Sequence, residues 1–226
     1  MTGTHLVTGA GSGIGACVAA MLQARGDTVV LLARSKDRAA QLSEHFGGAE
    51  TLVADLTDPT SVGDVQLPES LDSVVHAAGV VELGHVEDLT AGQWRHQVDV
   101  NLLAPAELTR VALPALRAAR GTVVFVNSGS GLRANPGWAA YAASKFGLRA
   151  VADALRAEER EHGVRVTSIY PGRTATPMQE QVHQHEGKDY DPEAWVQPET
   201  VADAVLHTID LPRDATIPDL TVSPGP

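Results

Sequence analysis

The stretch Thr8-Gly9-Ala10-Gly11-Ser12-Gly13-Ile14-Gly15 lies between an apolar run, Thr4 to Thr8, and an alanine-rich segment that continues to about Arg25. The run predicts a buried strand and the segment predicts a helix. Glycines in this context allow a tight turn and the close approach of backbone N–H groups to a pyrophosphate. The stretch therefore predicts a dinucleotide-binding turn, whose cofactor-binding residues are Gly9, Gly11, Ser12, Gly13, Ile14 and Gly15.

Outward from this turn, apolar runs alternate with helical segments to the end of the chain. Further strands are expected at 27–33, 50–54, 72–76, 122–126, 164–170 and 219–223, and helices at 38–46, 91–118, 141–161 and 198–209. This alternation predicts an α/β fold: one Rossmann-like domain over residues 1–226, a doubly wound parallel sheet of about seven strands with helices on both faces. Residues 177–197 are polar and predicted to be irregular, which favours a loop or lid that covers the substrate.

The end of the second expected strand bears on the choice of cofactor. An acidic residue at this place binds a ribose 2′-hydroxyl in dinucleotide folds, whereas an arginine accommodates a 2′-phosphate. Here the strand ends at Ala33 and Arg34 follows, so the sequence favours NADP over NAD. The alternative is a solvated basic start to the next helix, since Lys36 and Arg38 come soon after.

Three polar side chains later in the chain suggest proton transfer. Tyr141 and Lys145 are four residues apart, which places both on one face of a helix. Ser128 follows the apolar run 122–126, so its hydroxyl lies at the carboxyl end of a strand, where α/β sheets bind ligands. A nearby ammonium would lower the tyrosine pKa from its ordinary value of ~10, and the serine could hydrogen-bond a developing oxyanion. A surface tyrosine and lysine on an ordinary helix is the alternative.

Composition excludes several classes of function. The net charge of −11 over 226 residues argues against nucleic-acid binding, which needs a basic surface. No apolar run approaches the ~18 residues of a membrane span, and Cys17 is the only cysteine, which suits a reducing compartment. We expect a soluble cytoplasmic protein. The acidic and histidine side chains of 183–191 match no zinc spacing, so no metal site is predicted.

These motifs occur in an order and register that resemble the short-chain dehydrogenase/reductase family along essentially the whole chain. The interval between Ser128 and Tyr141 matches the family's usual spacing. The resemblance rests on the Thr8–Gly15 turn, Asp55, Ala77-Ala78-Gly79, Asn101, Ser128, Tyr141-x-x-x-Lys145 and Pro171-Gly172.

The resemblance implies a catalytic tetrad of Asn101, Ser128, Tyr141 and Lys145. Tyr141 would exchange a proton with the substrate oxygen that Ser128 holds. Lys145 would lower the phenol pKa and bind the nicotinamide ribose, and Asn101 would support Lys145 through a water molecule. The implied activity is NADP(H)-dependent interconversion of a carbonyl and an alcohol. Further implied cofactor-binding residues are Asp55 and Leu56 near the adenine, Ala77, Ala78, Gly79, Pro171, Gly172 and Thr174, and Thr176 near the carboxamide.

The family usually assembles through the helices that carry Asn101 and Tyr141, so a homodimer or homotetramer is expected. One departure from the pattern is that His76-Ala77 replaces two asparagines, which puts the rigidity of this turn in question. A structural role is favoured for His76. The remaining alternative is a dinucleotide-binding regulator or scaffold without turnover; such proteins typically lose the tyrosine or lysine, and both are present here.

Overall fold

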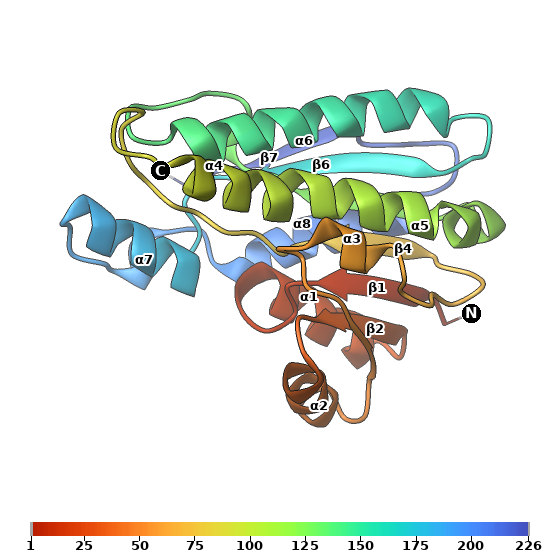
Figure 1. The fold of residues 1–226 in the computed structure, drawn as a ribbon. Helices are drawn as coiled ribbons and strands as arrows, with labels where there is room; N and C mark the ends of the chain where they lie inside the picture. The colour runs from red at the N-terminus through yellow and green to blue at the C-terminus, as the bar shows by residue number, and fades with distance from the viewer. Residues whose placement is uncertain (1, 226) are drawn as a thin grey trace.

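A parallel β-sheet forms the centre of the protein (Figure 1). The computed structural model describes residues 2–225, and within them the sheet has seven strands in the order β3-β2-β1-β4-β5-β6-β7. The strands are β1 Thr4–Thr8, β2 Thr28–Ala33, β3 Glu50–Val53, β4 Ser73–His76, β5 Thr122–Val126, β6 Arg165–Pro171 and β7 Asp219–Val222. The predicted doubly wound α/β fold is confirmed.

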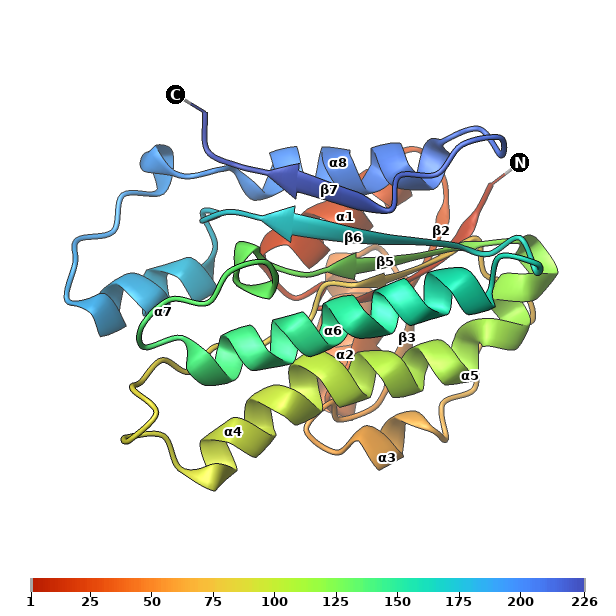
Figure 2. The ribbon, with the colours of Figure 1, turned by 90° about the horizontal axis from the view of Figure 1, so that it is seen from above.

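Helices cover both faces of the sheet (Figure 2). Strands such as β5 are buried along their whole length, because a parallel sheet packs apolar side chains on each face. One core lies under α1 Gly13–Ala24, α2 Lys36–His45 and α8 Pro198–Asp210. The second core lies under α3 Pro59–Val62, α5 Ala104–Ala119 and α6 Ala139–Glu158. No helix within residues 2–225 is long and apolar enough to cross a membrane.

The helix expected over residues 91–118 is interrupted at its middle. It consists of α4 Ala91–Val98, a π-helical turn Asp99–Leu103, and α5. The N–H of Ala104 bonds to the carbonyl of Asp99, one residue further back than in an α-helix, and the next residue, Pro105, has no N–H to donate. The widened turn carries Asn101, and sequence periodicity gave no sign of it.

Residues 177–197 were predicted to be irregular, and for half of the segment this was wrong. Residues Pro177–Glu186 form α7. Thr176 accepts a hydrogen bond from the Gln179 N–H at the helix start, Pro177 occupies the first turn, and Gly187 closes the helix at a φ of +64°. The capping residues set the ends of this helix. Its sequence is mostly polar, so it shows no helical periodicity of apolar residues from which it could be predicted.

Two smaller expectations also need correction. The short helix α3 was not predicted, because its four residues are too few to show a period. The helix expected at 141–161 is α6 Ala139–Glu158, so it ends three residues earlier than predicted. Gly163, with a φ of +73°, lies in the turn that leads from this helix to β6.

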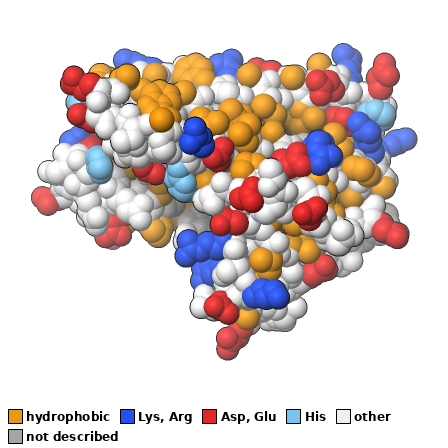
Figure 3. Space-filling model, viewed as in Figure 1, with side chains coloured by type: hydrophobic (Ala, Val, Ile, Leu, Met, Phe, Trp, Pro, Cys, Tyr) orange, Lys and Arg blue, Asp and Glu red, His pale blue; other side chains and the backbone are white. Residues whose placement is uncertain are grey.

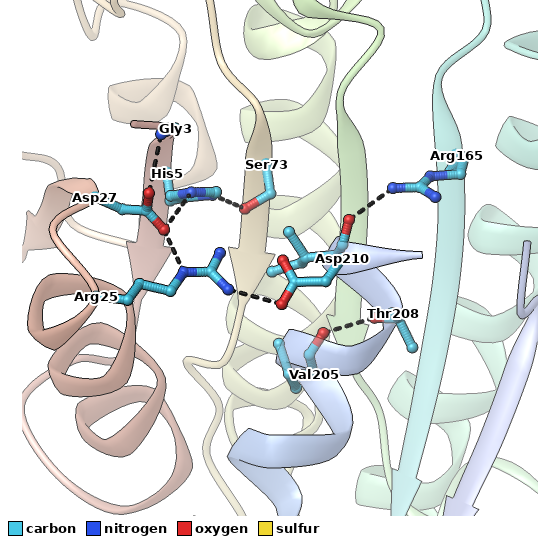
Figure 4. Close-up of polar contacts among 10 residues, drawn as sticks. Gly3, His5, Arg25, Asp27, Ser73, Arg165, Val205, Thr208 and Asp210 are labelled. Carbon is cyan, nitrogen blue, oxygen red and sulfur yellow. Dashed lines mark hydrogen bonds and ion pairs between the residues drawn. The ribbon is translucent and has the colours of Figure 1, made fainter. Parts of the chain in front are cut away.

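A polar network fastens the amino-terminal edge of the sheet (Figure 4). His5 Nδ1 lies 2.8 Å from Ser73 Oγ, and His5 Nε2 lies 3.3 Å from Asp27 Oδ2. Arg25 pairs with Asp27 and, at 2.7 Å, with Asp210 at the end of α8. Burial lowers the pKa of His5, which keeps the ring neutral. These contacts join β1, β4, the α1–β2 turn and α8 at the edge opposite the strands' carboxyl ends.

Candidate functional site

A cavity of about 1110 Å³ opens at the carboxyl ends of the strands. The strands point toward the side of the molecule where α7 lies (Figure 2), and the space-filling view shows Lys and Arg side chains beside the hollow between α7 and α2 (Figure 3). This edge is where open α/β sheets bind ligands. The predicted site residues that line the cavity are Gly9, Gly11, Ser12, Gly13, Ile14, Arg34, Leu56, Ala77, Ala78, Gly79, Ser128, Tyr141, Lys145, Pro171, Gly172, Thr174 and Thr176.

The glycine turn between β1 and α1 has the shape that a pyrophosphate needs. The Ser12 side chain makes no capping hydrogen bond at the start of α1, so the first backbone N–H groups of the helix remain available to an anion. Gly9 has a φ of +73°, and a Cβ there would come within 2.7 Å of the Ala77 backbone. Gly15 does not line the cavity; a Cβ on it would lie 2.5 Å from the Gly9 carbonyl oxygen, so it lets α1 pack on the turn.

Thr8 fixes the loop in which alanine replaces the family's asparagine. Its Oγ1 accepts hydrogen bonds of 3.1 Å from the N–H groups of both Ala77 and Ala78. The backbone next to the cavity is thus held without an amide side chain.

His76 lies away from the cavity and packs in the core. Its ring stacks on Phe125 with centroids 4.9 Å apart, and its Nε2 lies 2.9 Å from Thr109 Oγ1. Thr109 donates its own proton to the Pro105 carbonyl, so Nε2 acts as the donor to Thr109. Burial lowers the pKa of His76 to about 3. These contacts agree with the structural role favoured for this residue.

Tyr141 and Lys145 emerge from the first turns of α6, next to Ser128 at the end of β5. Lys145 Nζ donates to the Val126 carbonyl at 3.1 Å and lies 5.8 Å from the centre of the Tyr141 ring. The Ser128 hydroxyl accepts a 3.1 Å hydrogen bond from the Ser130 N–H. All three side chains therefore meet beside the glycine turn in one cavity.

The electrostatics of this pair differ from the sequence-based expectation. Burial raises the pKa of Tyr141, and a hydrogen bond with Ser128 partly offsets the rise. Burial also lowers the pKa of Lys145 to about 8. Desolvation disfavours the charged form of both groups, and it is the largest cause of the Tyr141 shift, so the tyrosine pKa is raised where the sequence predicted a fall. A protonated phenol at neutral pH is suited to donate a proton.

Asn101 does not line the cavity but braces its wall. Its Oδ1 accepts from the Val80 N–H and its Nδ2 donates to the Val80 carbonyl, both at 2.9 Å. The same Nδ2 donates to Ser144 Oγ at 3.1 Å, and Ser144 donates to the Tyr141 carbonyl at 2.7 Å. Asn101 thus connects the loop after β4 to the helix turn that carries Tyr141.

At the far end of the cavity, Arg34 and Arg38 follow β2. Arg38 Nη2 donates to the Gly11 carbonyl at 3.2 Å. Asp55 does not line the cavity. It accepts hydrogen bonds from the N–H and hydroxyl of Thr57, which lower its pKa, and the charge of Arg34 adds to this effect. Asp55 therefore shapes the loop that brings Leu56 to the cavity.

Several residues of the cavity wall were not among the predicted site residues. Asn127 donates from Nδ2 to the Lys145 carbonyl at 3.2 Å, and the Trp138 ring packs edge-on against Tyr141 at 5.8 Å. Asn127 could have been found as the polar residue that directly precedes Ser128, but its contact with α6 is visible only in three dimensions. Arg38, Arg133 and Arg173 also line the cavity and were not predicted as site residues.

Comparison with known proteins identifies the family. Residues 4–187 match the family model described as short chain dehydrogenase. An uncharacterised oxidoreductase of Staphylococcus epidermidis is 29% identical over 226 residues, which cover 97% of this chain and 96% of the relative. An uncharacterised oxidoreductase of Staphylococcus aureus is also 29% identical, over 227 residues.

Two solved structures share the fold over nearly the full length. An alcohol dehydrogenase from the archaeon Thermococcus sibiricus, complexed with 5-hydroxy-NADP, has a TM-score of 0.82 and 25% identity, covering 99% of this chain and 97% of its own. A putative NAD(P)-dependent gluconate 5-dehydrogenase from Beutenbergia cavernae with bound NADP has a TM-score of 0.83 and 29% identity, covering 97% and 94%. Together with the family match and the cavity geometry, these likenesses establish that the chain belongs to the short-chain dehydrogenase/reductase family, whose members are carbonyl/alcohol oxidoreductases.

Proposed function

We propose that the protein is an NADP(H)-dependent oxidoreductase that interconverts a carbonyl and an alcohol with Ser128, Tyr141, Lys145 and Asn101. The observation that carries this proposal is that Ser128, Tyr141 and Lys145 line the same cavity as the glycine turn. A bound nicotinamide ring supplies or accepts the hydride.

Each residue has a role that follows from its contacts. The Ser130 N–H already occupies one lone pair of Ser128 Oγ, so the serine proton is available to a substrate oxygen. Tyr141 keeps its proton at neutral pH because burial raises its pKa, and it donates this proton to the carbonyl oxygen during reduction. Lys145, when charged, stabilises the phenolate that remains. Asn101 positions the Tyr141 turn through Ser144.

The preference for NADP rests on the residues after β2. Arg34 and Arg38 line the cavity, and β2 ends at Ala33 where an NAD site would place an acid. A guanidinium can bind a 2′-phosphate through two parallel hydrogen bonds. The NADP and 5-hydroxy-NADP bound in the two related structures support the same choice.

Three further features belong to this proposal. Gln179, Val182 and Glu186 of α7 line the cavity, which supports residues 177–197 as the segment that covers the substrate.

Leu103 and Phe146, 45% and 40% exposed, lie on the helices through which we expect a homodimer or homotetramer to form. The single cysteine suits the reducing cytoplasm.

The substitution Tyr141→Phe tests the activity. It removes the proton donor but keeps the ring, so we expect kcat for carbonyl reduction to fall by roughly 10²–10⁴-fold while NADPH affinity is kept. NADPH absorbance with a panel of ketones and aldehydes gives the rate, and fluorescence titration gives the affinity. Tyr170→Phe, a buried tyrosine of β6 that does not line the cavity, is the matched control. Equal turnover in both variants would remove Tyr141 from the mechanism, and nucleotide binding without turnover in the wild type would favour the regulator or scaffold.

The substitution Arg34→Ala tests the choice of cofactor. Loss of a charge-assisted hydrogen bond costs about 1.5–3 kcal/mol, so we expect NADPH affinity to fall by roughly tenfold or more while NADH affinity changes little. Titration of the wild type and the variant with both cofactors measures the four dissociation constants. A wild type that binds NADH more tightly would show that the interpretation of the β2 end is wrong.

A further inference from the structure

The cavity wall is cationic in a protein that is strongly acidic overall. The chain has a net charge of −11, yet within residues 2–225 the wall contains one carboxylate, Glu186, and five basic side chains, Arg34, Arg38, Arg133, Lys145 and Arg173. A cleft lined by one sign of charge concentrates ligands of the opposite sign. The cofactor's phosphates account for only part of this charge, because the basic residues lie at both ends of the cavity.

Four of the five basic side chains have a partner or a place near the cofactor phosphates. Lys145 donates to the Val126 carbonyl. Arg173 pairs with Glu186 at 2.6 Å, and its guanidinium lies 5.4 Å from the Trp195 ring. Arg38 donates to Gly11, and Arg34 lies near Asp55 at the end of β2.

Arg133 is the exception. Like Arg34, it forms no side-chain hydrogen bond or ion pair with any of residues 2–225, although it lines the cavity; unlike Arg34, it does not follow β2. Its five N–H donors are therefore without a partner among these residues and available to a ligand.

The position of Arg133 places it at the substrate end. Its N–H donates to the carbonyl of Gly129, the neighbour of Ser128, at 3.1 Å. The segment 132–138 ends at Trp138, which packs against Tyr141. Arg34 follows β2 and this segment follows β5, three positions away in the sheet, which corresponds to about 14 Å. Arg133 therefore borders the reacting groups and lies far from the adenosine end.

We propose that the substrate is an oxo acid or hydroxy acid whose carboxylate is bound by Arg133 while Ser128 and Tyr141 hold its reacting oxygen. This inference rests on the proposed function and adds the substrate class. A guanidinium matches a carboxylate through two parallel hydrogen bonds. A carboxylate also fits the charge, because one unpaired guanidinium balances a single negative charge and leaves the second charge of a phosphate monoester unbalanced.

Matched pairs of substrates test the proposal. The probes are a series of straight-chain oxo acids with the ketone one to four carbons from the carboxylate, each compared with its methyl ester and with the phosphate monoester of the corresponding oxo alcohol. We expect the wild type to prefer at least one acid over its ester by about tenfold in kcat/KM, mainly through KM, as a charge-assisted hydrogen bond predicts. In Arg133→Gln the ratio of kcat/KM for the acid to kcat/KM for its ester should fall about tenfold, to near one.

Arg160→Gln is the matched control, because Arg160 is an exposed arginine outside the cavity and its loss changes the net charge equally. A second readout is independent of turnover: binding of the preferred acid to Tyr141→Phe saturated with NADPH, measured by calorimetry, should weaken about tenfold when Arg133→Gln is added. Unchanged acid preference in Arg133→Gln, equal use of acids and esters by the wild type, or preference for the phosphate would overturn the proposal and leave the oxidoreductase function intact. Absence of NADPH oxidation with every probe and with the neutral carbonyl panel would overturn both.

Discussion

Asn127 connects the strand that carries Ser128 with the helix that carries Tyr141 and Lys145. Its Nδ2 donates to the Lys145 carbonyl, while its buried Oδ1 has no hydrogen-bond partner among residues 2–225 and packs against Gly131. A Cβ on Gly131 would lie 2.6 Å from this oxygen, so this side of the amide has room only for a glycine. The amide fixes the distance between the two parts of the proposed catalytic set.

We expect Asn127→Ala to act on positioning more than on binding. Loss of the bond to the Lys145 carbonyl should lower the free energy of unfolding by about 1 kcal/mol and kcat by roughly tenfold or more, because small misplacements of reacting groups are costly. NADPH affinity should change little, and Asn127→Ser, which retains a short hydroxyl donor, should recover part of kcat. Steady-state kinetics, cofactor titration and urea unfolding separate these effects. A loss of stability with unchanged kcat would assign Asn127 to packing alone.

At the scale of single residues, sequence reasoning identified the chemistry but not its energetics. Their positions in the sequence predicted that Ser128, Tyr141 and Lys145 lie close together, and all three line the cavity. The direction of the Tyr141 pKa shift was wrong, because the depth of burial around α6 depends on the tertiary packing. The roles of Asn127 and Arg133 could not be predicted for the same reason, since their contacts also depend on the tertiary packing.

Among the elements, the turn between β1 and α1 has tight steric constraints. Gly9 lies against the Ala77–Ala78 backbone, which Thr8 holds from the other side. The fold class was predictable from this turn and from the alternation of strands and helices. The π-helical turn at Asn101 and the helix α7 were not, because the first depends on backbone hydrogen-bond register and the second on caps at its ends.

The contact at Gly9 predicts the effect of adding one methyl group. Gly9→Ala combines a positive φ with overlap of backbone atoms at 2.7 Å, so we expect a loss of about 3 kcal/mol or more in the free energy of unfolding. Gly187→Ala is the control, since Gly187 has a similar φ of +64° and nothing within 4 Å of the added Cβ; it should lose only about 1 kcal/mol. Urea unfolding of both variants measures the difference. Equal losses would mean that backbone strain alone, and not the approach of β4's loop, requires glycine at position 9.

For the whole molecule, buried neutral histidines make folding sensitive to acid. Burial lowers the pKa of His76 to about 3 and also lowers that of His5, while a histidine in an unfolded chain titrates near ~6.5. Below this pH the unfolded chain binds a proton that the folded protein excludes. Each such histidine therefore leaves stability unchanged above about pH 6.5 and reduces it as the pH falls toward its folded pKa.

The variant His76→Asn should reveal this contribution. Between about pH 6 and pH 4 the wild-type free energy of unfolding should fall more steeply than that of the variant, by about 1.4 kcal/mol per pH unit. Urea unfolding at several pH values gives both slopes, and contributions from the carboxylates cancel in the comparison. Parallel curves for the two proteins would show that His76 is not held neutral in the folded state.

The packing of α8 against α1 determines when, during translation, the apolar side of α1 becomes covered. The glycine turn and α1 are translated before α8, because Val201, Ala202 and Val205, which share a core with α1, come about 180 residues later. The other wall of the cavity is completed later still, because the Gly172 N–H donates to the carbonyl of Val222 in β7. While the residues between α1 and α8 are translated, the apolar side of α1 is therefore not yet covered by α8, and exposed apolar surface of this kind favours aggregation.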